Sequence, residues 1–169
     1  CFISSAFSQA HKAKYGLWGV LEMSEGYESL KLERQLCFPL YVCSKEVVRR
    51  YKPALDPIGL TYTQFITMMA LWEHRQVNVK KLGDLLYLDS GTLTPVLKKL
   101  EQKGYVQRKR SPEDERNLLI TITEKGEELR KQALTVPDRM SKCVHLTEDE
   151  SAELYRLLHK MMDSMTDPE

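Results

Sequence analysis

The chain has 169 residues, of which 42% are hydrophobic and 29% are charged, and its formal net charge is +1. This length is enough for one domain with a hydrophobic core, and the near-zero charge means that basic surfaces must be sought segment by segment. The 4 cysteines do not suggest a secreted disulfide scaffold, and no apolar run is long enough to span a membrane. We therefore expect a cytoplasmic protein without membrane contact.

Residues 1–28 show no steady hydrophobic period and contain Met23, a candidate translation start. No basic segment precedes the apolar residues, so this stretch does not resemble a signal peptide. We treat residues 1–28 as an N-terminal extension without an assigned role.

A helical pattern follows over residues 30–55. Pro39 cannot donate an i→i−4 hydrogen bond, so the helix either bends at Pro39 or begins near it. Thr61 and Gln64 then have the spacing of a capping box, which predicts the start of a second helix that ends near His74.

Two further short helices are predicted in the middle of the chain. Asn78 can cap the first, and a tight turn at residues 87–88 leads to the second, which begins at Asp89 or Ser90 and ends before Gly104. The second helix buries an apolar stripe. Its other face carries short hydroxyls and cations, as a helix in a DNA major groove requires, but an ordinary surface helix fits equally well. That face comprises Ser90, Thr92, Thr94, Lys98, Lys99 and Gln102.

After Gly104 the hydrophobic period changes to two. Residues 105–109 and 117–121 are predicted strands, and residues 111–116 have the composition of a turn. A hairpin directly after such a helix is typical of a winged helix, and its cations favour DNA binding over a purely structural hairpin. These cations are Arg108, Lys109, Arg110 and Arg116.

The C-terminal segment predicts two more helices. Thr123 caps a long one that continues toward Leu134 and bends near Pro137, and Thr147 with Glu150 opens the last one. The last helix has an apolar stripe that fits either intrachain core or, more economically, a dimer interface. The stripe comprises Leu154, Leu157, Leu158, Met161, Met162 and Met165.

The expected fold is therefore mainly α with a small β-hairpin wing: a winged helix-turn-helix that dimerises through its N- and C-terminal helices. Residues 29–58 would form an N-terminal dimerisation helix, residues 59–123 the DNA-binding lobe, and residues 124–169 the C-terminal dimerisation helices.

Several segments together resemble the MarR family of winged-helix regulators, and in particular its organic hydroperoxide resistance regulator (OhrR) branch. The resemblance is carried by residues 32–41, 51–53, 60–65, 71–73, 88–100 and 113–116. Family members are homodimeric repressors that bind pseudo-palindromic double-stranded DNA and leave it when an N-terminal cysteine is oxidised by organic hydroperoxide. The resemblance implies a regulator of this kind, without a cofactor or a bound metal, rather than an enzyme.

The resemblance also assigns a redox site. Cys37 would be the sensing cysteine, and the hydroxyls of Tyr51 and Tyr62 from the partner subunit would hydrogen-bond its sulfur. Tyr41 occupies the position of a third tyrosine that rearranges on oxidation. The chemistry agrees, because the thiolate is the reactive form of cysteine and needs donors or positive potential around it.

The other cysteines decide which reaction follows. Members with one cysteine stop at the sulfenic acid and then cap it with a small thiol, whereas members with two close an intersubunit disulfide. We hypothesise that Cys143 is the second cysteine. Cys43 is interpreted as a packing residue, because it lies on a different helix face from Cys37.

For DNA contact, the resemblance implies a set in the second short helix and a set in the wing, where Asp114 would hold Arg116. Arg108 and Arg110 would meet phosphates or the minor groove. The full set is Ser90, Thr92, Thr94, Pro95, Lys98, Lys99, Arg108, Arg110, Asp114 and Arg116.

Three other interpretations stay open at this stage. One is a MarR-type repressor released by a small phenolic or lipophilic ligand, in which Cys37 is incidental. Another is a zinc sensor built from Cys143, His145 and His159, although the Cys-x-His signal is weak. The third is a thiol peroxidase with Cys37 as nucleophile, which would require turnover with a reductant.

Overall fold

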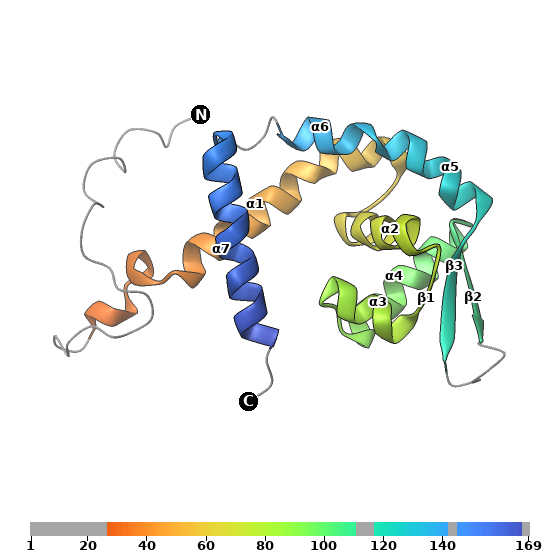
Figure 1. Ribbon diagram of the computed structural model, residues 1–169, viewed down its shortest axis with the longest axis horizontal. Coiled ribbons are helices and arrows are strands. Elements are labelled where there is room, and N and C mark those ends of the chain that lie inside the picture. The colour runs from red at the N-terminus through yellow and green to blue at the C-terminus, as the bar shows by residue number, and fades with distance from the viewer. Residues whose placement is uncertain (1–26, 111–116, 142–144, 167–169) are drawn as a thin grey trace. The chain divides into compact units, whose positions relative to one another are not determined.

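The computed structural model describes residues 27–110, 117–141 and 145–166 (Figure 1). The chain divides into two units, residues 1–49 and 50–169. In the parts that the structure describes, no helix is both long and apolar enough to cross a membrane.

The first unit contains two short 3-10 turns and most of the first α-helix. The turns are η1 (Glu28–Leu30) and η2 (Leu32–Arg34), and α1 covers Cys37–Leu55. The prediction of a helix from residue 30 is therefore wrong at its start, whereas a beginning near Pro39 is confirmed. Pro39 lies in the first turn, where the N–H that proline lacks would have no partner inside the helix.

The second unit continues with η3 (Asp56–Ile58) and α2 (Tyr62–His74). The predicted capping box at the start of α2 is confirmed. The hydroxyl of Thr61 accepts a hydrogen bond from the backbone N–H of Gln64, and the Gln64 side chain accepts one from the backbone N–H of Thr61. Together they satisfy two donors that the first helical turn leaves free.

The two short helices of the predicted helix-turn-helix are α3 (Val79–Leu86) and α4 (Ser90–Gln102). The side chain of Asn78 accepts from the backbone N–H of Lys81 at 2.7 Å, and that of Asp89 accepts from Thr92 at 2.9 Å. Tyr87, between the helices, has a left-handed backbone with φ 52°, and Gly104 after α4 has φ 75°. Both predicted caps and the predicted left-handed glycine are confirmed.

The sheet has three antiparallel strands: β1 (Gln76–Asn78), β2 (Val106–Arg110) and β3 (Leu118–Ile122). The spatial order is β1-β3-β2, so β3 is the middle strand. In the register, Val77 lies opposite Ile120, and Arg108 lies opposite Ile120 on the other side. The predicted hairpin is confirmed, and β1 is a strand that the sequence analysis did not anticipate.

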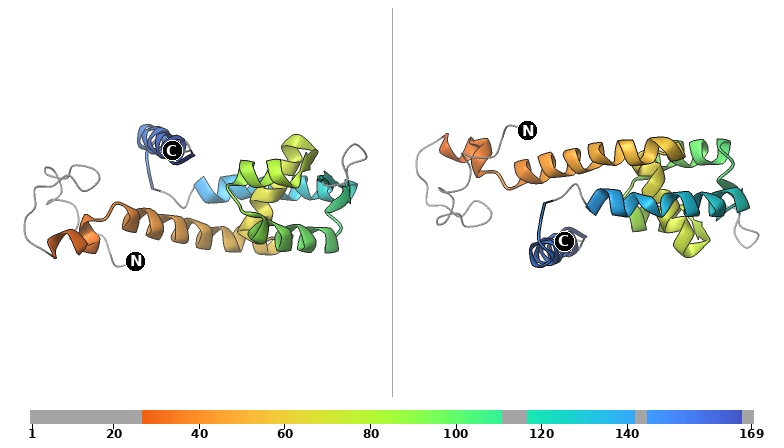
Figure 2. Two further views of the ribbon diagram at one scale, coloured as in Figure 1. Left: turned by 90° about the horizontal axis from the view of Figure 1, so that it is seen from below. Right: turned by 90° about the horizontal axis from the view of Figure 1, so that it is seen from above.

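One hydrophobic core joins these elements. Helices α2, α3 and α4 contact one another and the strands of the sheet (Figure 1). Figure 2 shows the helices from below and from above. The side chains of α4 that face this core are those of the predicted apolar stripe, although Val96 is only partly buried. The core residues with at most 1% exposure are Leu55, Met68, Leu71, Leu82, Leu93, Leu100, Val106, Ile120 and Val136.

Three helices complete the chain: α5 (Glu124–Ala133), α6 (Thr135–Ser141) and α7 (Glu148–Thr166). Thr123 caps α5 by accepting from the backbone N–H of Gly126 at 3.0 Å, as predicted. The long helix that we expected to bend near Pro137 is instead two helices separated at Leu134. The second predicted capping box is present, because the Thr147 hydroxyl accepts from the backbone N–H of Glu150.

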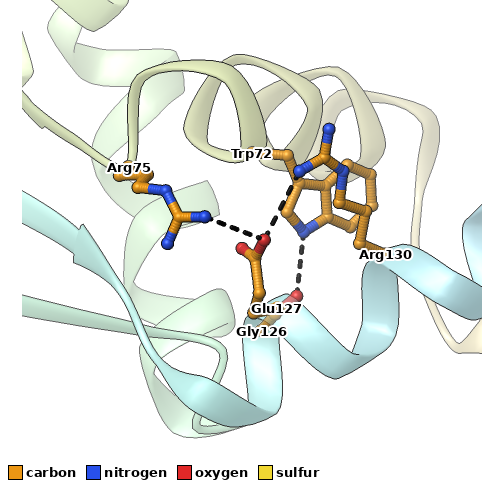
Figure 3. Close-up of polar contacts among 5 residues, drawn as sticks. All are labelled: Trp72, Arg75, Gly126, Glu127 and Arg130. Carbon is orange, nitrogen blue, oxygen red and sulfur yellow. Dashed lines mark hydrogen bonds and ion pairs between the residues drawn. The ribbon is translucent and has the colours of Figure 1, made fainter.

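The end of α2 is joined to the start of α5 by polar contacts (Figure 3). The indole N–H of Trp72 donates to the backbone carbonyl of Gly126 at 2.8 Å. The carboxylate of Glu127 lies 3.8 Å from the Arg75 guanidinium and 3.4 Å from that of Arg130. Because Trp72 is 7% exposed, its hydrogen bond is shielded from water and fixes the two helix ends relative to each other.

Candidate functional site

The exposed face of α4 carries all the side chains that the sequence predicts for it. The buried stripe turns the remaining positions outward, so the polar residues lie together along one side of the helix. Small hydroxyl groups lie toward the N-terminal end of this face and two ammonium groups lie further along. Its exposed members are Ser90, Thr92, Thr94, Pro95, Lys98, Lys99 and Gln102.

Asp89 organises the N-terminal end of this face. One carboxylate oxygen accepts from the backbone N–H of Thr92 at 2.9 Å, and the other accepts from the Thr92 hydroxyl at 2.8 Å. These two hydrogen bonds lower the pKa of Asp89, with the backbone bond the larger cause. The Thr92 hydroxyl therefore has its hydrogen committed to Asp89 and presents lone pairs to the outside.

In the wing, Arg108 is tied to α4. Its guanidinium contacts the Glu101 carboxylate at 2.7 Å through Nε and at 2.6 Å through Nη2, and its backbone N–H donates to Glu101 as well. The hydrogen bond from Arg108 is the main cause that lowers the pKa of Glu101. The Arg108 side chain is 24% exposed, so it joins the wing to α4, whereas Arg110 is exposed at the end of β2. Asp114 and Arg116 lie outside the described residues.

Cys37 is the first residue of α1, and its thiol is exposed. Tyr41 follows at i+4 and is 61% exposed, with the ammonium group of Lys45 6.0 Å from its ring centroid. Cys43, for which the sequence favours a packing role, is also exposed in the single chain.

The two other predicted tyrosines lie in contact within the second unit. The ring centroids of Tyr51 and Tyr62 are 4.8 Å apart, and Phe65 lies 6.0 Å from Tyr51. Burial raises the pKa of Tyr51, and the neighbouring Tyr62 adds to this effect. A tyrosine hydroxyl carries its proton at neutral pH, and the raised pKa leaves that unchanged, so the Tyr51 hydroxyl has a hydrogen to donate.

Cys143 lies outside the described residues, so neither the disulfide nor the zinc site that includes it has a geometry to report. Among residues that the structure does describe, no three His, Cys, Asp or Glu side chains gather closely enough to hold a metal ion.

Comparison with known proteins places this geometry in a family. A family profile described as "Transcriptional regulator SarA/Rot" matches residues 49–133. The organic hydroperoxide resistance transcriptional regulator of Bacillus subtilis is 43% identical over 143 residues, which cover 85% of this chain and 97% of that protein. The chain belongs to the MarR family of winged-helix regulators, in its OhrR-like branch.

Solved structures of the MarR family agree with the fold. Reduced AbfR bound to DNA superposes with a TM-score of 0.67 at 34% identity, covering 83% of this chain and 98% of AbfR. A disulfide-formed structure of AbfR gives a TM-score of 0.58 at 32% identity, covering 83% of this chain and 96% of AbfR. AbfR is a protein of Staphylococcus epidermidis.

The sequence analysis missed one residue, Lys103, whose side chain links the end of α4 to the start of α2. Lys103, just after α4, donates to the backbone carbonyl of Gly59 and to the side chain of Gln64 in the first turn of α2. The capping-box spacing identified Gln64, but nothing in the sequence indicates that Lys103 contacts it.

Proposed function

We propose that this chain is a homodimeric DNA-binding repressor that leaves its operator when an organic hydroperoxide oxidises Cys37. The pairing of Tyr51 with Tyr62 carries this proposal. It supplies, on one surface, the hydroxyl donors that a peroxide-reactive thiolate needs. The membership in the OhrR-like branch supports the same function.

DNA recognition is assigned to α4 and the wing. Short hydroxyls such as those of Ser90 and Thr94 suit base edges in a major groove, and ammonium groups suit phosphates. In the wing, Arg110 and Arg116 are proposed to reach the backbone or the minor groove, with Asp114 orienting Arg116. Arg108 is proposed to position the wing through Glu101, with only its remaining donors available to phosphate.

Lys98→Ala should weaken operator binding and reduce the slope of log K against log salt concentration by about 1, because one phosphate contact releases about one counterion. The measurement is a salt series of fluorescence-anisotropy titrations with a labelled operator duplex. Lys131→Ala, which removes the same charge from the exposed surface of α5, is the control and should leave the slope unchanged. Equal slopes for both variants and the native protein would contradict a groove-facing α4.

The redox reaction consumes the protein's own thiol and does not turn over, so we assign a switch rather than an enzyme. The Cys37 thiolate attacks the terminal peroxide oxygen, and the S–O bond forms as the O–O bond breaks. The departing alkoxide takes a proton and leaves as an alcohol, and Cys37 becomes the sulfenic acid. The sulfur is oxidised by two electrons and the hydroperoxide is reduced by two.

The donors for Cys37 are proposed to come from a second copy of the chain. Side chains on one helix are neighbours when they are three or four positions apart, whereas Tyr51 follows Cys37 by fourteen positions in the sequence. The family resemblance assigns the tyrosine donors to the partner subunit. We therefore assign Tyr51 and Tyr62 of the partner subunit to the thiolate, and Tyr41 to the rearrangement that follows oxidation.

Dimerisation is assigned to residues 29–58 and 124–169, with residues 59–123 as the DNA-binding lobe. In the single chain, α1 and α7 expose large apolar side chains, which is a pattern typical of a surface covered in an oligomer. The exposed apolar side chains are Leu36, Phe38, Val42 and Val48 before or in α1, and Leu154, Leu157, Leu158, Met162 and Met165 in α7.

Cys143→Ser should abolish a hydroperoxide-induced interchain disulfide if Cys143 resolves the sulfenic acid of Cys37. In that reaction the Cys143 thiol attacks the oxidised sulfur, and the disulfide forms with loss of water. Non-reducing electrophoresis measures the dimer band, with Cys43→Ser as the matched control that should retain it. A band that persists in the Cys143→Ser protein would assign the second cysteine elsewhere.

The function itself is tested by gel-shift binding to an A·T-rich inverted-repeat duplex, selected by this protein from a randomised pool, with and without cumene hydroperoxide. Release by hydroperoxide that dithiothreitol reverses supports the proposal. Binding that ignores hydroperoxide but is released by an aromatic acid would favour the alternative, a repressor that responds to a phenolic or lipophilic ligand.

A further inference from the structure

The Lys103 side chain joins the end of the recognition helix α4 to the start of α2. Its ammonium nitrogen donates to the backbone carbonyl of Gly59 at 2.5 Å and to the side-chain oxygen of Gln64 at 3.0 Å. Gln64 is 3% exposed and its hydrogen bond with Lys103 is partly buried, whereas the hydrogen bond to the Gly59 carbonyl lies at the exposed surface.

Both acceptors belong to the segment that positions Tyr62. Gly59 has a left-handed backbone with φ 65°, where no Cβ is present to add strain, and its carbonyl meets Lys103. Gln64 closes the capping box with Thr61, and the same side-chain oxygen that accepts from Thr61 also accepts from Lys103. Tyr62 lies between these two residues in the sequence, as the first residue of α2, so a backbone displacement at Tyr62 would reach the acceptors of Lys103.

The end of α4 also forms hydrogen bonds with residues at the start of α5. The Lys103 backbone carbonyl accepts from the ammonium group of Lys125 at 2.8 Å, and the Gly104 carbonyl accepts from the Thr123 hydroxyl at 2.7 Å. The end of α4 is thus held from two directions by hydrogen bonds. The hydrogen bonds toward α5 use backbone carbonyls of this end as acceptors, whereas those toward α2 come from the Lys103 side chain and add to the apolar contacts between α2 and α4 in the core.

The electrostatics of Lys103 favour a positional role over a large contribution to stability. Burial lowers the pKa of its ammonium group, and the neighbouring charge of Lys99 adds to this effect. Its hydrogen-bond partners are neutral, so little Coulomb attraction offsets the lost hydration of the charge. The hydrogen bonds of Lys103 instead fix the end of α4 relative to the start of α2.

We propose that Lys103 is a positioning residue that couples the tyrosine-bearing start of α2 to the recognition helix α4, so that a displacement of Tyr62 on oxidation of Cys37 re-orients α4 on DNA. This inference rests on the proposed function and deepens it. In the reduced state the Gly59 and Gln64 contacts hold α4 in its DNA-binding orientation. When Tyr62 moves, the capping box moves with it and Lys103 loses the geometry of both hydrogen bonds.

The test is Lys103→Met, which keeps the length and the apolar stem of the side chain but removes its donors. The readout is the operator dissociation constant after treatment with cumene hydroperoxide divided by the one before treatment. We expect this ratio to fall from the 5- to 150-fold range of ordinary allosteric coupling in the native protein to about 1 in the variant. Intact-mass analysis establishes that Cys37 is oxidised to the same extent in both proteins.

Lys125→Met is the matched control, because it loosens the same end of α4 on the α5 side and leaves the Gly59 and Gln64 contacts in place. It should retain the native ratio, and Lys103→Arg, which restores donors, should recover most of it. If Lys103→Met does not fold, Lys103→Ala replaces it in the same measurement.

The outcomes separate the two proposals. A native protein that keeps its DNA after oxidation overturns the proposed function and this inference with it. A native protein that responds, together with a Lys103 variant that gives an unchanged ratio, overturns the inference alone. An equal fall of the ratio in Lys125→Met and Lys103→Met also overturns the inference. Any loosening of the end of α4 would then be enough to remove the response to oxidation, whichever contact is lost.

Discussion

Cys37→Ser should remove the response to organic hydroperoxide while the reduced protein still binds its operator. A serine hydroxyl has nearly the shape of the thiol, so the start of α1 is preserved. It does not form an anion near neutral pH, and it does not cleave a peroxide O–O bond as a thiolate does. The ratio of operator dissociation constants with and without cumene hydroperoxide should fall from about 5-fold or more to about 1.

Anisotropy titration of the operator measures this ratio, and mass spectrometry follows oxidation of the cysteine. Cys43→Ser is the matched control, since Cys43 is another exposed cysteine of α1 and has no proposed role in sensing. It should respond as the native protein does. A Cys37→Ser protein that still leaves DNA on oxidation would move the sensor to another residue.

Gly126→Ala should destabilise the fold by about 3 kcal/mol or more, at the upper end of the cost of overpacking. A Cβ at this position would overlap the backbone oxygen of Tyr105 and would lie 2.9 Å from a side-chain carbon of Ile122. The Tyr105 oxygen cannot retreat freely, because it accepts a hydrogen bond from the backbone N–H of Thr123. Any shift of Gly126 would in turn disturb its hydrogen bond with Trp72 (Figure 3).

Thermal and urea unfolding of the reduced protein measure this loss, with an expected fall in Tm of about 6–12 °C or more for a chain of this size. Gly59→Ala is the control that separates crowding from backbone strain. Gly59 has φ 65°, but no atom lies within 4 Å of the place that an alanine methyl group would take, so the cost should be about 1–2 kcal/mol. Equal losses in the two variants would show that crowding at Gly126 is relieved by relaxation.

Local chemistry explains why the helix starts were predictable. Five predicted capping side chains accept a hydrogen bond from the backbone N–H three residues further along the chain. They are Thr61, Asn78, Asp89, Thr123 and Thr147. A cap of this kind needs only a short polar side chain at the right spacing, so it is visible in the sequence. The hairpin was predictable for a similar reason, because its strands alternate with a period of two and are separated by turn-forming residues.

Features that depend on distant parts of the chain were not predictable. Strand β1 has only three residues and exists because it pairs with β3, more than forty positions later. Leu85 fits the apolar period of α3, yet it is 43% exposed, since the core reaches only one side of this short helix. The start of α1 was misplaced because Leu36 fits the apolar pattern of the helix, whereas the chain before Cys37 forms two 3-10 turns and Leu36 lies in the turn that follows them.

In the candidate site, too, features set by the local sequence were predictable and contacts between distant residues were not. The outward face of α4 follows from its period and its cap. The contact between Tyr51 and Tyr62 joins two helices and was not predicted, because the resemblance only assigned both hydroxyls to Cys37. The ion pair of Arg108 with Glu101 changes the role of a cation that looks freely available in the sequence. Charge in a sequence indicates a basic segment, but the partners of each cation are decided by packing.

The middle position of β3 has a practical consequence for engineering. Because β3 pairs with β1 on one edge and with β2 on the other, the base of the wing is part of the folded sheet rather than an independent hairpin. The connection between β2 and β3 is therefore a natural grafting point. Exchanging residues 111–116 for the corresponding segment of another regulator would test the DNA contact proposed for the wing while the three paired strands are kept.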